Sequence, residues 1–177
     1  FRADVAVLMN ITPDHLDRYE YRMQNYVDSK FRVIRNMRPE DTFIYSDDDP
    51  VIAGELGKYP MTMHRLPFSV KRNERPGASL CGGTFTATDG TLSVEMETAR
   101  MRIKGIHNTY DAMAATLAAL SAGVEPDSIR RTLESFAGVE HRLEPAGELD
   151  GVLYVNDSKA TNVDSVWYAL ELSLIHI

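Results

Sequence analysis

The stretch Asp4-Val5-Ala6-Val7-Leu8-Met9-Asn10-Ile11 decides how this chain folds. It is a continuous apolar run rich in valine, leucine and isoleucine, and such runs are typical of strands buried on both faces of a parallel sheet. The polar stretch Thr12-Pro13-Asp14-His15 ends the run. We therefore expect a buried parallel strand over residues 4–11, with polar side chains at its carboxyl end.

Alternating elements follow this strand. Apolar residues recur at roughly helical spacing through residues 23–36, and a short strand over residues 42–45 ends in the acidic turn Asp47-Asp48-Asp49-Pro50. A short helix over residues 51–56 and a strand over residues 61–66 come next. This β-α-β-α-β order predicts an α/β fold with a mostly parallel sheet and crossover helices.

The remainder of the chain contains an antiparallel region, and its turns carry Asp-Gly pairs that favour hairpins. The expected elements are a hairpin of residues 84–88 and 91–95 around Asp89-Gly90, a strand over 100–104, helices over 109–122 and 126–136, a hinge at 138–142, and a hairpin of residues 143–149 and 151–155 around Asp150-Gly151.

Composition excludes some classes of function. The 177 residues carry 19 basic and 26 acidic side chains, for a net charge of -7, which argues against non-specific nucleic-acid binding. The single cysteine, Cys81, excludes an internal disulfide and fits a reducing cytoplasm. No apolar run approaches the ~20 residues of a membrane helix. We expect a cytoplasmic monomer without nucleic-acid or membrane partners.

Two polar clusters follow predicted strands, one at residues 14–17 and the other at residues 105–108. Asp14, His15 and Asp17 offer oxygen and nitrogen donors suited to a divalent cation, although a polar loop with an Asp helix cap explains the cluster better when it is taken alone. Lys30 lies on the next helix, where a lone lysine is usually solvated. Gly105-Ile106-His107-Asn108 precedes an alanine-rich helix and suits phosphate or base binding, unless Asn108 is simply the helix cap.

Two further clusters lie near the end of the chain. His141-Arg142 offers cations for phosphate at the expected hinge, or an ion pair with Glu140 or Glu144. The run Asn156-Asp157-Ser158-Lys159-Ala160-Thr161-Asn162 follows an apolar strand, and open α/β sheets bind ligands at carboxyl strand ends. The alternatives there are an Asp157–Lys159 pair and a Thr161 helix cap.

Taken in order, these motifs resemble those of the Mur ligases, the ATP-dependent amide-bond ligases of peptidoglycan synthesis. The resemblance spans residues 4–171 and rests on four motifs, Asn10-Ile11-Thr12-Pro13-Asp14-His15-Leu16-Asp17, Gly105-x-His107-Asn108, Glu140-His141-Arg142-Leu143-Glu144 and Asn156–Asn162. The last motif is similar to that of the branch that adds D-glutamate. Sibling branches carry an aromatic residue and histidines at that place.

The resemblance implies a division into domains. Residues 1–138 are expected to be the central ATPase domain, and residues 139–171 the start of a carboxyl-terminal Rossmann-like domain. The phosphate-loop pattern G-x-x-x-x-G-K-[ST] does not occur in the sequence. We therefore expect a fragment that binds ATP weakly and turns over nothing alone. We also expect residues 172–177 to be a non-native tail, because the helix-like stretch before them ends without a cap or a glycine stop.

The resemblance also implies roles for individual residues. His15 and Lys30 match the catalytic-centre groups that bind magnesium, with Lys30 carbamylated. The residues matched to ATP contacts are Asn108, Asp111, Arg142, Asp157 and Lys159, and those matched to substrate contacts are Ser158 and Thr161. Asp111 departs from the asparagine usual in the family, because a carboxylate cannot donate the hydrogen bonds of an amide.

The reaction implied is the ATP- and Mg2+-dependent joining of D-glutamate to UDP-N-acetylmuramoyl-L-alanine through an acyl phosphate. Two alternatives stay open. One is a sibling Mur or folylpolyglutamate ligase that adds another amino acid. The other is a non-catalytic nucleotide- or metal-binding module, which Asp111 supports.

Overall fold

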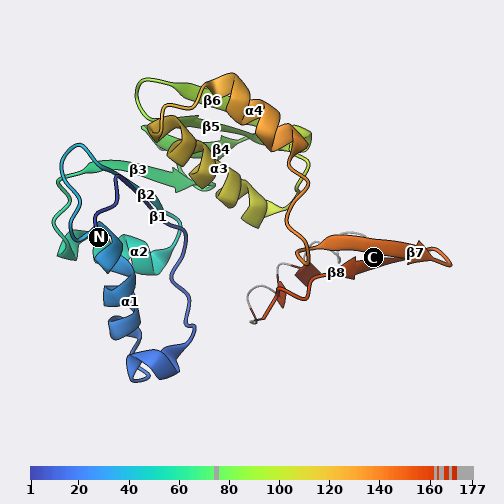
Figure 1. Cartoon of the computed structure of the whole chain (residues 1–177), viewed down its shortest axis with the longest axis horizontal. Coiled ribbons are helices and arrows are strands. Elements are labelled where there is room, and N and C mark those ends of the chain that lie inside the picture. Colours follow the sequence, from blue (N-terminus) through green and yellow to red (C-terminus); the bar gives the residue numbers. More distant parts are fainter. Residues whose placement is uncertain (74–75, 162, 164–165, 168, 171–177) are drawn as a thin grey trace.

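The computed structural model describes residues 1–73, 76–161, 163, 166–167 and 169–170. Within them it contains a six-stranded sheet covered by helices and a separate two-stranded hairpin (Figure 1). The strands of the large sheet lie in sequence order, and the first four are mutually parallel. The predicted α/β fold with a mostly parallel sheet and an antiparallel region is confirmed.

The first half of the chain forms two crossover units. Its elements are β1 (Val5–Leu8), α1 (Met23–Phe31), β2 (Thr42–Ser46), α2 (Pro50–Glu55) and β3 (His64–Ser69), with short 3-10 turns η1 (Leu16–Tyr19), η2 (Arg32–Ile34) and η3 (Leu56–Lys58). The predicted β-α-β-α-β order is confirmed. The helix expected over residues 23–36 ends earlier, at Phe31, because Arg32 N bonds to the carbonyls of both Asp28 and Lys30 and the chain tightens into η2.

The second half adds β4 (Gly77–Cys81), β5 (Thr84–Thr88), β6 (Ser93–Glu97), η4 (Thr98–Arg100), α3 (Ile106–Ser121) and α4 (Pro126–Ser135). The hairpin around Asp89-Gly90 is confirmed as β5 and β6. Sequence reasoning missed β4, because none of its residues is β-branched or aromatic and they have weak strand preference. Its place is set by long-range pairing with β3 on one side and β5 on the other.

The prediction of a strand over residues 100–104 is wrong, because these residues form the end of η4 and a loop. After η4 the ammonium of Lys104 donates to the carbonyls of Ala99 and Met101, so the chain curls back on itself. Met101 is buried in the core cluster beneath α3, and its apolar side chain produced the misleading pattern. The helix expected from residue 109 begins three residues earlier, at Ile106.

Alternate residues of β2 pack into two different cores. Ile44 belongs to the cluster beneath α3, whereas Phe43 and Tyr45 belong to the cluster beneath α1 and α2. Successive side chains of a strand point to opposite faces, so the sheet is covered on both sides. This burial on both faces explains why the first strands are almost wholly apolar.

The hairpin β7 (Glu144–Leu149) and β8 (Val152–Asn156) projects from the sheet and connects to α4 through residues 136–143 (Figure 1). It confirms the hairpin expected around Asp150-Gly151, where both residues have positive φ. The domain division at residues 138–139 stays a prediction. The tail expected at residues 172–177 lies outside the described residues. In the part of the chain that the structure describes, every helix is too short or too polar to cross a membrane.

Candidate functional site

The turn after β2 connects two loops at the carboxyl edge of the sheet. Asp49 caps α2 by accepting two backbone hydrogen bonds of 2.9 and 2.8 Å with one carboxylate oxygen. Its other oxygen accepts a hydrogen bond from Ile11 N at 2.9 Å. The loop that leads from β1 to Asp14 and His15 is therefore anchored to this turn.

Asp48, in the same turn, joins the end of β3 to the start of α3. Its carboxylate accepts hydrogen bonds from Ser69 Oγ at 2.7 Å, Val70 N at 2.7 Å and the Tyr110 hydroxyl at 2.8 Å. Burial by itself raises the pKa of Asp48, but the three hydrogen bonds outweigh it, and the pKa lies below its usual value. Asp48 is therefore held as a carboxylate anion.

The structure places His15 on the surface, where the loop after β1 turns into η1. Its backbone is left-handed, with φ 50° and ψ 34°, a conformation that histidine, like asparagine and aspartate, adopts more often than other non-glycine residues. His15 Nε2 lies 3.6 Å from Asp14 Oδ2, and both side chains are accessible. An imidazole beside a carboxylate is chemically suited to a divalent cation.

Lys30 lies in the last turn of α1 and is exposed. Its ammonium stands 5.0 Å from the centre of the Tyr26 ring, a cation–π contact. Tyr26 in turn packs edge-on against Tyr19, with ring centres 5.0 Å apart. These contacts fix α1, which carries Lys30, against η1, which directly follows His15.

The donors for a metal are incomplete in the described part of the chain, where no group of three His, Cys, Asp or Glu side chains is arranged to hold an ion. His15 and Asp14 fit a divalent cation by donor type, whereas the cationic amine of Lys30 does not unless it is converted to a carbamate. The metal-binding roles of His15 and Lys30 stay predictions.

The Gly-x-His-Asn motif opens α3. Gly105 is the N-cap, with φ 100°, a conformation that favours glycine. The alternative that Asn108 caps the helix is wrong, because its side-chain amide donates to Lys104 O at 2.7 Å from within the first turn. The motif therefore places His107 and Asn108 in the first turn of a 16-residue helix, and both are half-buried.

Charges from two other predicted motifs surround this first turn. Burial lowers the pKa of His107, and the carboxylates of Asp111 and Asp157 oppose that change. Asp111 is exposed as a residue, but partial burial of its carboxyl raises its pKa, and the positive charges of His107 and Arg142 oppose that change. The start of α3 therefore lies within electrostatic range of Arg142 in the hinge and of Asp157 after β8.

Hydrogen bonds join the hinge motif to the end of β8 directly. Asp157 Oδ1 accepts from Leu143 N at 3.2 Å, and Lys159 N donates to His141 O at 3.1 Å. The Asn156 amide lies 2.9 Å from His141 Nδ1. Arg142 stands between two residues with positive φ, His141 at 66° and Leu143 at 47°. These contacts hold the backbone around Arg142 in a conformation that few residues adopt.

The remaining predicted residues lie at the rim of this region. Ser158, Lys159 and Thr161 are exposed, and Ser158 N donates to Asn156 Oδ1 at 3.2 Å. Glu144 Oε2 lies 3.6 Å from His141 Nδ1, a contact that is an ion pair only when the imidazole is protonated. The ion pair of Arg142 with Glu140 or Glu144 stays a prediction. Asn162 lies outside the described residues.

Sequence reasoning missed the connecting residues. The acidic turn was visible at a strand end, but nothing local indicated that Asp48 reaches Tyr110, which is 62 positions away. Ser69, fully buried at the end of β3, carried no recognisable signal.

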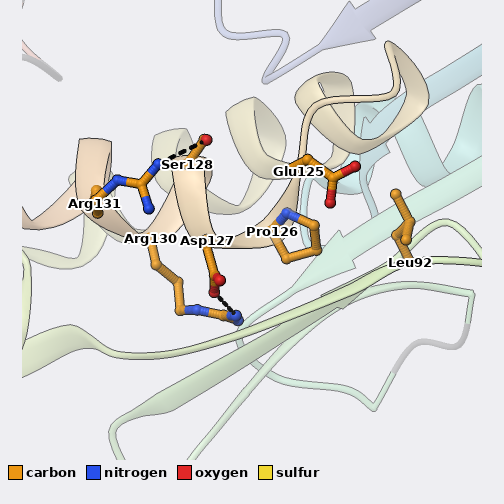
Figure 2. A pocket seen from close by; sticks show the side chains of 7 residues that line it. All are labelled: Leu92, Glu125, Pro126, Asp127, Ser128, Arg130 and Arg131. Atoms are coloured by element: carbon orange, nitrogen blue, oxygen red, sulfur yellow. Dashed lines mark hydrogen bonds and ion pairs between the residues drawn. The ribbon is translucent and has the colours of Figure 1, made fainter.

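An open pocket of about 530 Å³ lies elsewhere, between Leu92 and the first turns of α4 (Figure 2). None of the predicted site residues lines it. Its Arg130 guanidinium bonds to Asp127 at 2.5 Å, and its Arg131 guanidinium bonds to Ser128 at 3.0 Å. Because these cations already have partners, the pocket is not the candidate site.

Comparison with known proteins supports the family resemblance that the sequence motifs indicated. The chain is 47% identical over 171 residues to the UDP-N-acetylmuramoylalanine--D-glutamate ligase of Bacteroides fragilis, which covers 97% of this chain and 38% of that relative. It is 42% identical over 173 residues to the ligase of the same name from Porphyromonas gingivalis, with the same coverage. The chain thus spans less than two-fifths of the length of these relatives.

Solved structures share the fold. A crystal structure of MurF from Acinetobacter baumannii superposes with a TM-score of 0.74 at 22% identity, covering 98% of this chain and 38% of that one. The family described as Mur ligase middle domain matches residues 1–119, about two-thirds of the sequence. This chain belongs to the Mur ligase family, and residues 1–119 correspond to its middle domain.

Proposed function

We propose that this chain is part of an ATP-dependent ligase that joins D-glutamate to UDP-N-acetylmuramoyl-L-alanine. The observation that carries the proposal is the similarity, over 97% of the chain, to ligases of that name. The reaction would take place in the cytoplasm, where ATP is available. Residues 1–138 would belong to the central domain and residues 139–171 to the start of the third.

The proposed reaction has two steps. The substrate carboxylate attacks the γ-phosphorus of ATP, the bond to the bridging oxygen breaks, and ADP leaves. The amine of D-glutamate then attacks the carbonyl of the acyl phosphate, loses a proton, and phosphate leaves as the amide forms. Bound Mg2+ would supply positive charge that offsets the repulsion between carboxylate and triphosphate.

The nucleotide would lie among the α3 start, the hinge and the β8 end. In support, the charge of Arg142 acts to lower the pKa of Asp111, and the charge of Asp157 acts to raise the pKa of His107. One oxygen of Asp157 is engaged by Leu143 N, which leaves the other for a ribose hydroxyl. Asn108 keeps its side-chain oxygen as an acceptor, since its amide bonds to Lys104 O. A solved MurF ligase from Thermotoga maritima, in complex with ADP, shares this fold at a TM-score of 0.69 and 20% identity.

We assign the metal-binding role to His15 and a carbamylated Lys30. Carbamylation replaces a cation with an anionic oxygen donor, and the exposure of Lys30 leaves the amine open to carbon dioxide. Lys159, Ser158 and Thr161 would lie near the nucleotide and the incoming amino acid. All three are accessible at the end of β8.

The test is phosphate release by the full-length gene product with ATP, Mg2+ and UDP-N-acetylmuramoyl-L-alanine. We expect release to depend on D-glutamate and not on L-alanine, L-glutamate or a diamino acid. Stimulation by one of these others identifies a sibling ligase instead. Nucleotide binding without release under any condition identifies the non-catalytic module. The chain of residues 1–177 alone should bind ATP weakly and release no phosphate.

A further inference from the structure

Tyr110, in the first turns of α3, contacts the sheet both through its ring and through its hydroxyl. Its ring packs edge-on against Phe68, with centres 6.2 Å apart and planes at 62°. Its hydroxyl donates to Asp48 Oδ2 at 2.8 Å. A ring held both at its edge and at its hydroxyl fixes the rotation of the helix turn that carries it.

Asp48 is itself a rigid partner. Ser69 Oγ and Val70 N hold its carboxylate from β3, and Ser69 Oγ in turn accepts hydrogen bonds from Lys71 N at 3.0 Å and Arg72 N at 2.8 Å. Ser69 is fully buried. The carboxylate is therefore a fixed point on the sheet edge, and a hydrogen bond to a charged group is among the stronger ones in proteins.

The turn fixed in this way carries the candidate nucleotide groups. His107 precedes Tyr110 by three positions, so the two lie on the same side of α3, and Asp111 is the next residue. Gly105, the N-cap, has no side chain of its own with which to hold the turn. Tyr110 is thus placed to determine how His107, Asn108 and Asp111 face the hinge.

We propose that Tyr110 and Asp48 form a positioning pair that orients the first turn of α3 for nucleotide binding. The proposal rests on the proposed function in placing ATP at this turn, and it adds two residues that make no contact with the nucleotide. Because they act through the helix, their loss should weaken nucleotide binding and leave the use of the other substrates unchanged.

The experiment measures the dissociation constant for a non-hydrolysable ATP analogue with Mg2+, together with KM for ATP and for D-glutamate, in the full-length gene product. Tyr110→Phe removes only the hydroxyl, and Tyr59→Phe is its matched control. Tyr59 donates an equivalent hydrogen bond, of 2.9 Å, to Asp28 but lies on the opposite face of the sheet, against Phe31.

We expect Tyr110→Phe to raise the dissociation constant and KM for ATP by about 10-fold, the scale of one charged hydrogen bond, with KM for D-glutamate unchanged. Tyr59→Phe should leave all three constants within about 2-fold of wild type. Asp48→Ala, which also removes the partner of Ser69 Oγ and Val70 N, should weaken nucleotide binding at least as much as Tyr110→Phe, and the double variant should be no worse than Asp48→Ala. Asp48→Asn keeps an oxygen that can accept from Tyr110 but loses the charge, so it should weaken nucleotide binding less than Asp48→Ala does.

Unchanged nucleotide affinity in Tyr110→Phe would overturn the positioning role, as would an equal loss in Tyr59→Phe. The two proposals fail separately. If wild type binds the analogue but shows no D-glutamate-dependent phosphate release, the proposed reaction is wrong, and the comparison of dissociation constants still decides the role of Tyr110. A wild-type protein that does not bind the analogue overturns both.

Discussion

Asp49 accepts a hydrogen bond from the backbone of Ile11 at 2.9 Å while it also caps α2, so one carboxylate connects two loops at the sheet edge. Ile11 is buried, and the exposed His15 lies four residues beyond it. The position of the predicted metal loop therefore depends on a residue outside its own motif.

Asp49→Asn separates the two roles of this side chain. Asparagine caps helices as well as aspartate, but its amide nitrogen cannot accept a hydrogen bond from Ile11 N. We expect Asp49→Asn to lower the free energy of unfolding by about 1 kcal/mol and Asp49→Ala, which loses both roles, by about 2–3 kcal/mol. Urea denaturation measures both, and equal losses would contradict the separation.

The lowered pKa of Asp48 predicts an acid-dependent contribution to stability. The unfolded carboxyl has a pKa of about 3.9, and the folded one lies below it. Because the native state favours the anion, this contribution is complete above the unfolded pKa and is lost as pH falls through the folded pKa. The stability difference between wild type and Asp48→Asn should therefore be constant from pH 7 to about 5 and change only below pH 4. Denaturation at fixed pH values measures it.

The imidazole of His107 should titrate below the usual histidine range, since burial lowers its pKa. Asp157 opposes this effect, so Asp157→Asn should lower the pKa of His107 further. Asp127→Asn removes a carboxylate on α4 that bonds to Arg130 and should leave the pKa of His107 unchanged. An NMR titration of the imidazole signals decides this. A His107 pKa insensitive to Asp157→Asn would show that the β8 end does not lie beside α3 in solution.

Two glycines should respond oppositely to alanine. Gly105 has φ 100°, so Gly105→Ala should cost about 1–3 kcal/mol of unfolding free energy. Gly54 lies in α2 with no atom within 4 Å of an added Cβ, so Gly54→Ala should stabilise the chain by about 0.5–1 kcal/mol. Thermal or chemical denaturation gives both values, and losses of the same sign would refute the assignment.

If Lys30 acts as a carbamate, activity of the full-length gene product should depend on carbon dioxide. Buffers stripped of carbon dioxide should lower phosphate release, and added bicarbonate should restore it. Lys30→Arg keeps the positive charge over the Tyr26 ring but cannot form the carbamate, so it should be inactive while remaining folded. Wild-type activity in Lys30→Arg would exclude the role.

Local patterns determined much of this protein. Apolar runs, helical periodicity and Asp-Gly turns predicted the alternating first half and both hairpins, because each depends on neighbouring residues. The motifs likewise indicated the family. Prediction failed at β4, whose small residues carry no strand signal, and at residues 100–104, where the ammonium of Lys104 curls the chain.

Only the tertiary structure decided how the motifs meet. The hydrogen bond from Leu143 N to Asp157 joins the hinge motif to the motif after β8, and the hydrogen bond from the Tyr110 hydroxyl to Asp48 joins α3 to the sheet. Neither hydrogen bond can be predicted from the sequence, because an aspartate that accepts a hydrogen bond from a distant residue has the same neighbours in sequence as one that faces water. Local sequence specifies elements through short-range sterics and hydrogen bonding, whereas the packing of the sheet and its helices selects which distant polar groups become partners.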